Sequence, residues 1–207
     1  MNTDGYSFDV FLSYKHDPVW SKWVLRLFLP AFESNLRPIL PWPLQVYSDE
    51  RINEGELWPR SLREGLAQSR LLVPILTTHY FSSAWCCREL GLMLARQELL
   101  GRGSSLQPPI LIMPLILFDS MDFPDPARYL QGRSMHKYAY PDLTRSSALY
   151  KHFFEDIRGF AHAVHERLIA PPCSGMCDPQ WLHIDEGSHF NSLYCQQRRR
   201  LEKPFMG

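Results

Sequence analysis

The sequence has no net charge and no long hydrophobic run. It contains 22 Lys and Arg residues and 22 Asp and Glu residues, so its formal net charge at pH 7 is zero. Proteins that bind nucleic acid or an anionic membrane through their overall field carry an excess of positive charge, and the balance here argues against both partners. The longest apolar run covers residues 110–118 and is interrupted by Pro114. It is less than half as long as the ~20 residues that span a membrane, and it has the length of a buried strand.

The sequence also lacks the cysteine pattern of a disulfide-stabilised protein. Its five cysteines are an odd number, and Cys86 and Cys87 are adjacent, which is not the framework of a small secreted domain. Residues 1–5 are polar and lack the apolar segment of a secretory signal. A cytoplasmic location is therefore the default expectation.

The remaining cysteines lie near two histidines in the C-terminal part of the chain: Cys173, Cys177, His183, His189 and Cys195. A Cys-x3-Cys pair is within the range seen in zinc sites. The His-x5-His pair followed by a late cysteine is not the spacing of a zinc finger, so we predict no metal site.

Apolar runs alternate with segments of helical periodicity, which is typical of an α/β domain with a mostly parallel sheet. Strands are expected at residues 8–13, 44–47, 71–76, 110–118 and 135–139. Helices are expected from Asp17-Pro18 through residue 31, over residues 58–66, from a cap at Ser82 or Ser83 to about residue 100, and over residues 149–168.

Pro171-Pro172 ends the last expected helix. We therefore predict one domain over residues 1–170 and a C-terminal extension over residues 171–207. Three aromatic residues of the extension, Trp181, Phe190 and Tyr194, indicate that it packs on the domain or on a partner.

Polar residues gather in two segments that follow predicted strands. Residues 13–17 follow the first strand, and residues 77–89 follow the third. In an open parallel sheet, ligands bind beyond the carboxyl ends of the strands, at the point where the strand order reverses. If the order is 2-1-3-4-5, the first and third strands flank that point, and both segments line one cleft.

Trp85 and Glu89 lie four residues apart on one expected helix, which places them on the same helical face. An aromatic plane beside a carboxylate suits a ligand with a flat ring joined to a polar sugar. The same spacing also fits core packing by Trp85 and an ion pair between Glu89 and Arg88 or Arg96. Spacing alone leaves both interpretations open.

Three ordered segments of the chain resemble the three conserved boxes of TIR domains. They are residues 6–14 (Tyr-Ser-Phe-Asp-Val-Phe-Leu-Ser-Tyr), residues 46–55 (Val-Tyr-Ser-Asp-Glu-Arg-Ile-Asn-Glu-Gly) and residues 81–90 (Phe-Ser-Ser-Ala-Trp-Cys-Cys-Arg-Glu-Leu). The resemblance implies a flavodoxin-like three-layer α/β sandwich with a five-stranded parallel sheet in the order 2-1-3-4-5. It also implies that residues 48–56 form the BB loop, which mediates TIR self-association. The candidate assembly residues in that loop are Arg51, Ile52, Asn53 and Gly55.

Catalytic TIR domains cleave the nicotinamide–ribose bond of NAD+ with a glutamate one helical turn after a Trp or similar residue. The resemblance assigns that position to Glu89, and the form of residues 82–90 is similar to the enzymatic branch of the family. It further implies that NAD+ is the substrate, that no cofactor is needed, and that the product is ADP-ribose or a cyclic or conjugated form of it. The candidate substrate-binding residues are Ser13, Tyr14, Lys15, His16, Asp49, Ser82 and Trp85.

Two functions remain open on these grounds. The first is an NAD+-consuming enzyme similar to the stand-alone TIR component of Thoeris antiphage systems, whose product acts on a separate effector. The second is a non-catalytic TIR interaction module, or a TIR effector, that acts by homotypic TIR assembly. A flavodoxin-like receiver domain is disfavoured because the acidic cluster expected after the first strand is missing and Asp9 lies inside that strand. A nucleotide-binding domain is disfavoured because no phosphate-binding Gly-rich loop is present.

Overall fold

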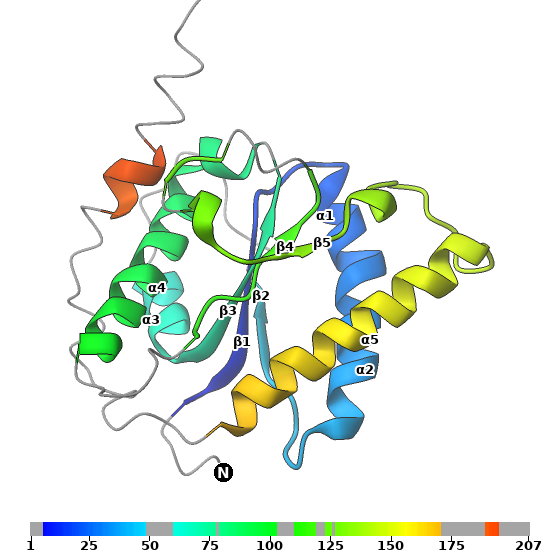
Figure 1. The fold of residues 1–207 in the computed structure, drawn as a ribbon, viewed down its shortest axis with the longest axis horizontal. Helices are drawn as coiled ribbons and strands as arrows, with labels where there is room; N and C mark the ends of the chain where they lie inside the picture. The colour runs from blue at the N-terminus through cyan, green and yellow to red at the C-terminus, as the bar shows by residue number, and fades with distance from the viewer. Residues whose placement is uncertain are drawn as a thin grey trace, which may run out of the picture.

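The computed structural model describes residues 6–48, 60–77, 79–102, 110–118, 123–125, 127–170 and 189–194. Across these residues a parallel sheet of five strands runs in the order β2-β1-β3-β4-β5 (Figure 1). The strands are β1 (Phe8–Tyr14), β2 (Val46–Ser48), β3 (Ser69–Leu76), β4 (Leu115–Ile116) and β5 (Arg133–Ser134). The predicted fold class and strand order are confirmed.

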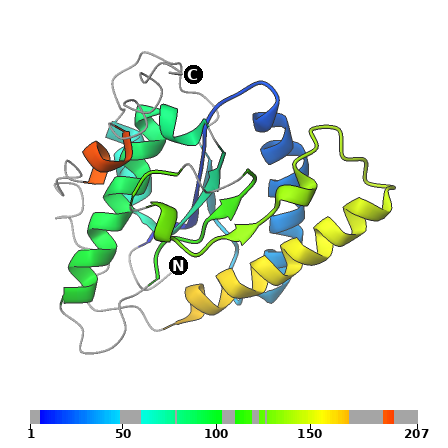
Figure 2. The same ribbon diagram turned by 45° about the horizontal axis from the view of Figure 1, so that its top comes forward.

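Helices cover both faces of the sheet and bury an apolar cluster on each. The helices are α1 (Trp20–Trp23), the π-helical η1 (Val24–Phe28), α2 (Leu29–Leu36), α3 (Arg60–Ala67), α4 (Ala84–Arg102) and α5 (Ala148–Ile169), with short 3-10 turns η2 (Arg37–Ile39), η3 (Tyr80–Ser82), η4 (Ala127–Tyr129) and η5 (His136–Tyr138). Helices α2 and α5 lie together on one face, and α3 and α4 lie on the other (Figures 1 and 2). Alternation along β1 serves both faces, because Val10 and Leu12 join the cluster under α2 and α5 while Phe11 joins the cluster under α3 and α4.

The first helical segment begins at Trp20, two residues later than predicted, and extends farther than predicted, although Asp17 makes the hydrogen bonds expected of it. Asp17 Oδ1 accepts hydrogen bonds from the backbone N–H groups of Val19 (2.9 Å) and Trp20 (3.2 Å), as an N-terminal cap does. Pro30 has no N–H to continue the α-helical bonding pattern. The preceding turn widens accordingly, with Leu29 N–H donating to Val24 O five residues back, and the helix continues to residue 36.

The caps of the two long helices are serines. Ser83 Oγ accepts from Cys86 N–H (3.4 Å), so Ser83 rather than Ser82 caps α4. Ser147 Oγ accepts from Tyr150 N–H (3.1 Å) at the start of α5. The predicted apolar stripe of α5 is buried at Phe153, Ile157, Phe160, Ala161, Val164 and Leu168.

The predicted fifth strand at residues 135–139 is wrong, since β5 is Arg133–Ser134 and residues 136–138 form a 3-10 turn. Met135 N–H still bonds to Ile116 O (2.7 Å), and the chain then turns inward. Met135 and Tyr138 are both fully buried three residues apart, which suits a 3-10 turn and not the alternation of a strand.

The predicted fourth strand at residues 110–118 is shorter in the structure, with regular pairing only at Leu115–Ile116. Leu72 N–H donates to Leu111 O (2.8 Å), and Leu117 N–H donates to Leu76 O (3.0 Å). Every second residue of β3 faces this neighbouring segment, and the one between Leu72 and Leu76 is Pro74, which has no N–H to donate. The extended segment is therefore paired at both ends and interrupted in the middle.

Three further boundaries differ from prediction. The second strand begins at Val46, because Leu44 packs into the core and Gln45 N–H bonds to Asp9. The third begins two residues early, at Ser69. Helix α4 runs through Gly101 instead of ending before it.

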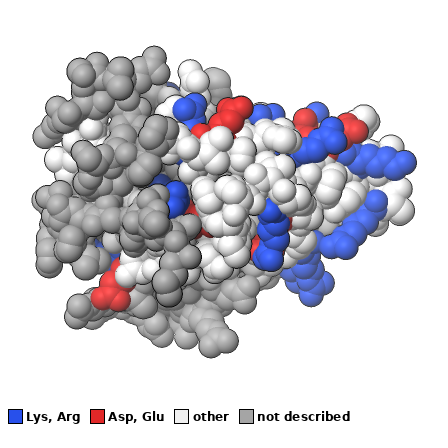
Figure 3. Space-filling view, turned by 90° about the horizontal axis from the view of Figure 1, so that it is seen from below, with Lys and Arg blue, Asp and Glu red and all other residues white. Residues whose placement is uncertain are grey.

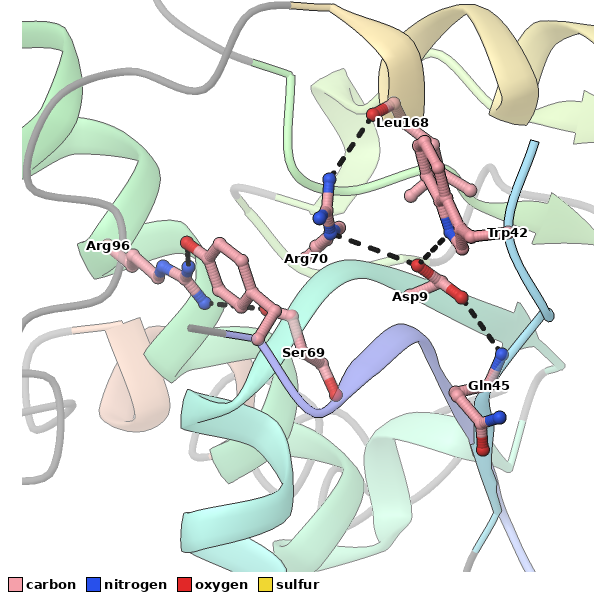
Figure 4. Close-up of polar contacts among 8 residues, drawn as sticks. Asp9, Trp42, Gln45, Ser69, Arg70, Arg96 and Leu168 are labelled. Carbon is pink, nitrogen blue, oxygen red and sulfur yellow. Dashed lines mark hydrogen bonds and ion pairs between the residues drawn. The ribbon is translucent and has the colours of Figure 1, made fainter. Parts of the chain in front are cut away.

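At the amino-terminal end of the sheet a buried network joins β1, β3, the segment before β2 and α5 (Figure 4). Asp9 accepts from Trp42 Nε1 (2.9 Å) and from Gln45 N–H (2.8 Å), and its Oδ1 lies 3.8 Å from Arg70 Nε. Arg70 also donates to Leu168 O near the end of α5 (3.4 Å). The network ties the last turn of α5 to the centre of the sheet.

Charged side chains of both signs mix on the surface. Seen from below, Lys and Arg side chains gather toward the end of the molecule where α5 begins, with acidic side chains among them (Figure 3). Exposed residues of this part include Arg145, Lys151, Glu155 and Arg158. Among the described helices none is long and apolar enough to cross a membrane.

Candidate active site

Ser13, Tyr80 and Glu89 meet beyond the carboxyl ends of β1 and β3. Ser13 is near the end of β1, Tyr80 opens the 3-10 turn η3 that follows β3, and Glu89 lies in the second turn of α4. Ser13 Oγ donates to Glu89 Oε2 at 2.5 Å and lies 2.8 Å from Tyr80 OH. These strands flank the point where the strand order reverses, which is where ligands bind in open parallel sheets.

The proton count fixes the direction of this short chain of hydrogen bonds. A hydroxyl carries one proton, and that of Ser13 is donated to Glu89. The 2.8 Å contact between Ser13 and Tyr80 therefore has the phenol as its donor, with Cys86 O as a second, longer acceptor at 3.2 Å. Tyr80 and Ser13 thus form a relay that ends on one carboxylate oxygen and holds it in place.

Burial gives the carboxylate a strong influence on its neighbours. The exposed fraction of Glu89 is 6%, and those of Ser13 and Tyr80 are 1% and 0%. Burial, and then the charges of Cys86 and Glu89, raise the pKa of Tyr80 well above its usual value, so the phenol stays protonated and remains a donor.

The adjacent thiols respond to the same charge. Burial, followed by the charge of Glu89, raises the pKa values of Cys86 and Cys87 well above the usual range for a thiol. Both thiols are therefore protonated at neutral pH and are poor nucleophiles. The chemistry available at this place is that of the carboxylate.

Other predicted residues lie around this centre. Lys15 Nζ donates to Ser82 Oγ (3.0 Å), and Ser82 Oγ donates to His79 O (2.7 Å), which joins the loop after β1 to the turn after β3. The rings of Tyr14 and His16 lie 5.0 Å apart, with Tyr14 buried and His16 exposed.

Trp85 is half-buried in the first turn of α4, one turn before Glu89. The two arginines considered as partners of Glu89 have other contacts. Arg88 lies over the ring of Phe190 at 4.9 Å, and Arg96 donates to Ser69 O (2.9 Å) at the far end of β3.

Five of the predicted site residues lie outside the described residues, and the site contains one residue, Tyr80, that was not predicted. Asp49 lies outside the described residues, as do the assembly residues of the BB loop, Arg51, Ile52, Asn53 and Gly55. Tyr80 was missed, although it stands in the polar segment after the third strand. An aromatic hydroxyl directly after a central strand is the signal that could have identified it.

No group of three or more His, Cys, Asp or Glu residues in the described ranges could hold a metal ion. His189 instead pairs with Glu98, with Nε2 and Oε1 3.2 Å apart. The C-terminal cysteines and His183 lie in segments that are not described.

A family model described as a TIR domain matches residues 10–156 of the chain, which include Ser13, Tyr80 and Glu89. The chain belongs to the TIR domain family. The TIR domains in a structure of the activated Roq1 resistosome directly recognizing the pathogen effector XopQ are 16% identical to this TIR domain. That similarity has a TM-score of 0.41 and covers 96% of this chain and 100% of the other. Residues 189–194 of the chain lie beyond the span that the family model matches.

Proposed function

We propose that this TIR domain cleaves the nicotinamide–ribose bond of NAD+ and that Glu89 is its catalytic carboxylate. The observation that carries the proposal is the fixed, buried carboxylate at the carboxyl ends of β1 and β3, held by the relay from Tyr80 through Ser13. Its place in the TIR fold is the place where a ligand reaches an open parallel sheet.

The reaction needs a negative charge beside the ribose. When the bond between ribose C1′ and the nicotinamide nitrogen breaks, the electron pair leaves with nicotinamide and neutralises its ring, and positive charge develops on the ribose. A preorganised carboxylate stabilises that charge, and it does so more strongly in a buried site than in water. Water that attacks C1′ gives ADP-ribose and releases a proton, whereas another nucleophile gives a cyclic or conjugated product.

The neighbouring residues have roles that follow from their chemistry. Lys15 is held against Ser82 beside the site, where its ammonium group suits the pyrophosphate of NAD+. Half-buried Trp85 is an aromatic surface on which a ring of NAD+ can stack, whereas Tyr14 is buried in the core and supports His16 at the edge of the site. We propose His16 as a second contact to the pyrophosphate and Asp49 as a residue that completes the site from the BB loop.

The cellular role that we propose is antiphage immunity, by resemblance to Thoeris TIR proteins. In that role TIR domains self-associate through the BB loop, and the nucleotide product is the signal to a separate effector. Both statements depend on the NAD+ reaction and can be examined once the product is identified.

The test is product analysis with the purified full chain. Wild-type protein, Glu89→Gln and Glu166→Gln are each incubated with NAD+, and the products are separated by chromatography and identified by mass spectrometry. Glu166 is an exposed carboxylate on α5 and serves as the matched control. We expect nicotinamide and an ADP-ribose product from wild type and Glu166→Gln, and a loss of about 100-fold or more in Glu89→Gln, in the range that removal of one electrostatic stabiliser costs.

The opposite result favours the assembly module. In that case wild type releases no nicotinamide, even with extract from infected cells, and Glu89→Gln is silent in vivo. Substitution of Arg51 or Ile52 would then abolish function on its own. Loss of function on BB-loop substitution alone does not separate the two functions, because catalytic TIR domains also assemble through that loop. Comparison of the BB-loop variant with Glu89→Gln does separate them.

A further inference from the structure

Residues 189–194 form a helical turn that packs on the outer side of α4, and Figures 1 and 2 show it in orange beside that helix. Leu193 is fully buried and belongs to the same apolar cluster as the inner face of α4. Phe190 and Tyr194 are partly buried against that cluster, with ring centroids 5.4 Å apart and planes within 12° of parallel. The turn is an integral part of the core on this face of the sheet.

The surface of α4 is shaped to receive this turn. Gly91 lies directly beneath it, and a Cβ atom at this position would stand 3.2 Å from Phe190 N and 3.5 Å from His189 Cβ. On either side of Gly91, Arg88 covers the ring of Phe190 at 4.9 Å, and Glu98 pairs with His189 at 3.2 Å. The contacts therefore extend along successive turns of α4, and the missing side chain of Gly91 permits the close approach.

The turn of α4 that is clamped in this way is the one that carries Glu89. Glu89 is bound from the sheet side by Ser13, while its neighbours Arg88 and Gly91 are covered from outside by Phe190. The first turn of a helix has backbone N–H groups without intrahelical partners and frays readily, so the position of Glu89 in the second turn depends on contacts that hold this part of α4 in place. A displacement of about 1 Å at a reacting group costs on the order of 100-fold in rate.

We propose that the segment 189–194 positions Glu89 by clamping the turn of α4 that carries it and the turns that follow, and that Leu193 and Phe190 are positioning residues of the active site. The segment lies outside the span that the TIR family model matches. Its effect on turnover rests on the proposed NAD+ reaction, whereas its effect on the order of α4 does not.

The experiment uses the full chain and compares Leu193→Asp, Leu193→Met and Ile169→Asp. Leu193→Asp places a charge where no water is present and releases the turn, whereas Leu193→Met conserves volume and keeps it docked. Ile169→Asp is the matched control, because Ile169 is 51% exposed at the end of α5. The measurements are hydrogen exchange of the peptide covering residues 84–92, and kcat and KM for NAD+.

We expect Leu193→Asp to raise exchange of residues 84–92 by about tenfold or more and to lower kcat by at least about tenfold, with a smaller change in KM. Leu193→Met and Ile169→Asp should match wild type in both measurements. Unchanged exchange and unchanged kcat in Leu193→Asp would overturn the proposal. If wild type itself does not cleave NAD+, the proposed function fails, and the exchange measurement still decides whether the segment clamps α4.

A second variant changes the α4 side of the same contact, and it provides the test if Leu193→Asp fails to fold. Gly91→Ala adds a Cβ that would stand 3.2 Å from Phe190 N, so the docked turn has to move away from α4, yet Ala is the better helix former. Faster exchange at residues 84–92 in Gly91→Ala therefore reports loss of the close approach and not a weaker helix. Slower exchange, as helix propensity alone predicts, together with an undiminished kcat, would contradict the clamp.

Discussion

Asp9→Asn tests whether the buried network at the amino-terminal end of the sheet holds the domain together. Asp9 has no exposed surface, and both of its oxygens accept hydrogen bonds: Oδ1 from Trp42 Nε1 and Oδ2 from Gln45 N–H. Asparagine has the same shape but replaces one oxygen with an NH2 group. In either orientation of the amide, that NH2 faces an N–H donor, so one hydrogen bond becomes a donor–donor contact.

The magnitude follows from the charges and their burial. A hydrogen bond to a charged group contributes about 1.5–3 kcal/mol, and removing one partner of a buried ion pair costs about 3–5 kcal/mol. The Arg70 side chain keeps 10% of its surface exposed and still donates to Leu168 O, so its charge stays partly compensated when Asp9 is replaced. We therefore expect Asp9→Asn to lower the free energy of unfolding by about 3 kcal/mol, a large share of the ~5–15 kcal/mol of a typical domain.

The assay is urea unfolding followed by circular dichroism on wild type, Asp9→Asn, Arg70→Met, the double variant and the exposed control Glu166→Gln. The double variant should lose at least ~1 kcal/mol less than the sum of the two single losses, because each single variant already breaks the same pair. The control should lie within ~0.5 kcal/mol of wild type. A loss below about 1 kcal/mol in Asp9→Asn, or strict additivity in the double variant, would refute the account of this network.

Three further predictions concern the candidate active site and the surface. Tyr80→Phe removes the donor at the start of the hydroxyl relay; we expect a loss of about 1–3 kcal/mol in the free energy of unfolding by urea titration and a lower kcat for NAD+, and an unchanged kcat would argue against the relay. Because burial raises the pKa values of Cys86 and Cys87, iodoacetamide at pH 8 should leave both unlabelled in the native protein and label both in urea, as peptide mass spectrometry would report; native labelling would contradict their placement. The hydrogen bond from Tyr138 lowers the pKa of Asp156. This carboxylate therefore stabilises the fold above its unfolded pKa of about 4 and loses that contribution as pH falls through its lower folded pKa. The urea unfolding of Asp156→Asn between pH 5 and pH 3 should be less pH-dependent than that of wild type, and identical pH dependence would count against this role of Asp156.

The elements that sequence analysis located well are those with long, regular patterns. The stripe of α5 repeats over many turns, and all eight residues of β3 are buried, as expected of a central parallel strand. The missed elements depend on contacts between distant residues. The interruption of β4 pairing comes from Pro74 on the neighbouring strand, and the inward turn after β5 comes from burial of Met135 and Tyr138.

The candidate site shows the same division. The placement of Ser13 and Glu89 together at the carboxyl ends of the strands could be predicted. The resemblance to TIR domains implied the strand order, and that order fixes which loops are neighbours. The part played by Tyr80 could not, because it depends on how η3 turns back so that the phenol reaches Ser13. The packing of Phe190 and Leu193 on α4 joins segments about a hundred residues apart, and no periodicity within either segment encodes it.

Among the residues that the structure describes, the buried carboxylates Asp9 and Glu89 differ in their surroundings, and the difference indicates which one serves the fold and which one can serve a reaction. Asp9 is 0% exposed and is met by an indole, a backbone N–H and the guanidinium of Arg70, so no ligand can reach it and its charge serves the fold. Glu89 retains 6% of its surface at the carboxyl ends of the strands and is oriented through Ser13 Oγ, a neutral donor that fixes one oxygen. A carboxylate that serves the fold is enclosed by permanent donors and a permanent countercharge, whereas one that stabilises transient positive charge needs a fixed position and an approach from outside. The second set of conditions is met at Glu89, which is why a glutamate so nearly buried is the residue on which we base the proposed NAD+ cleavage.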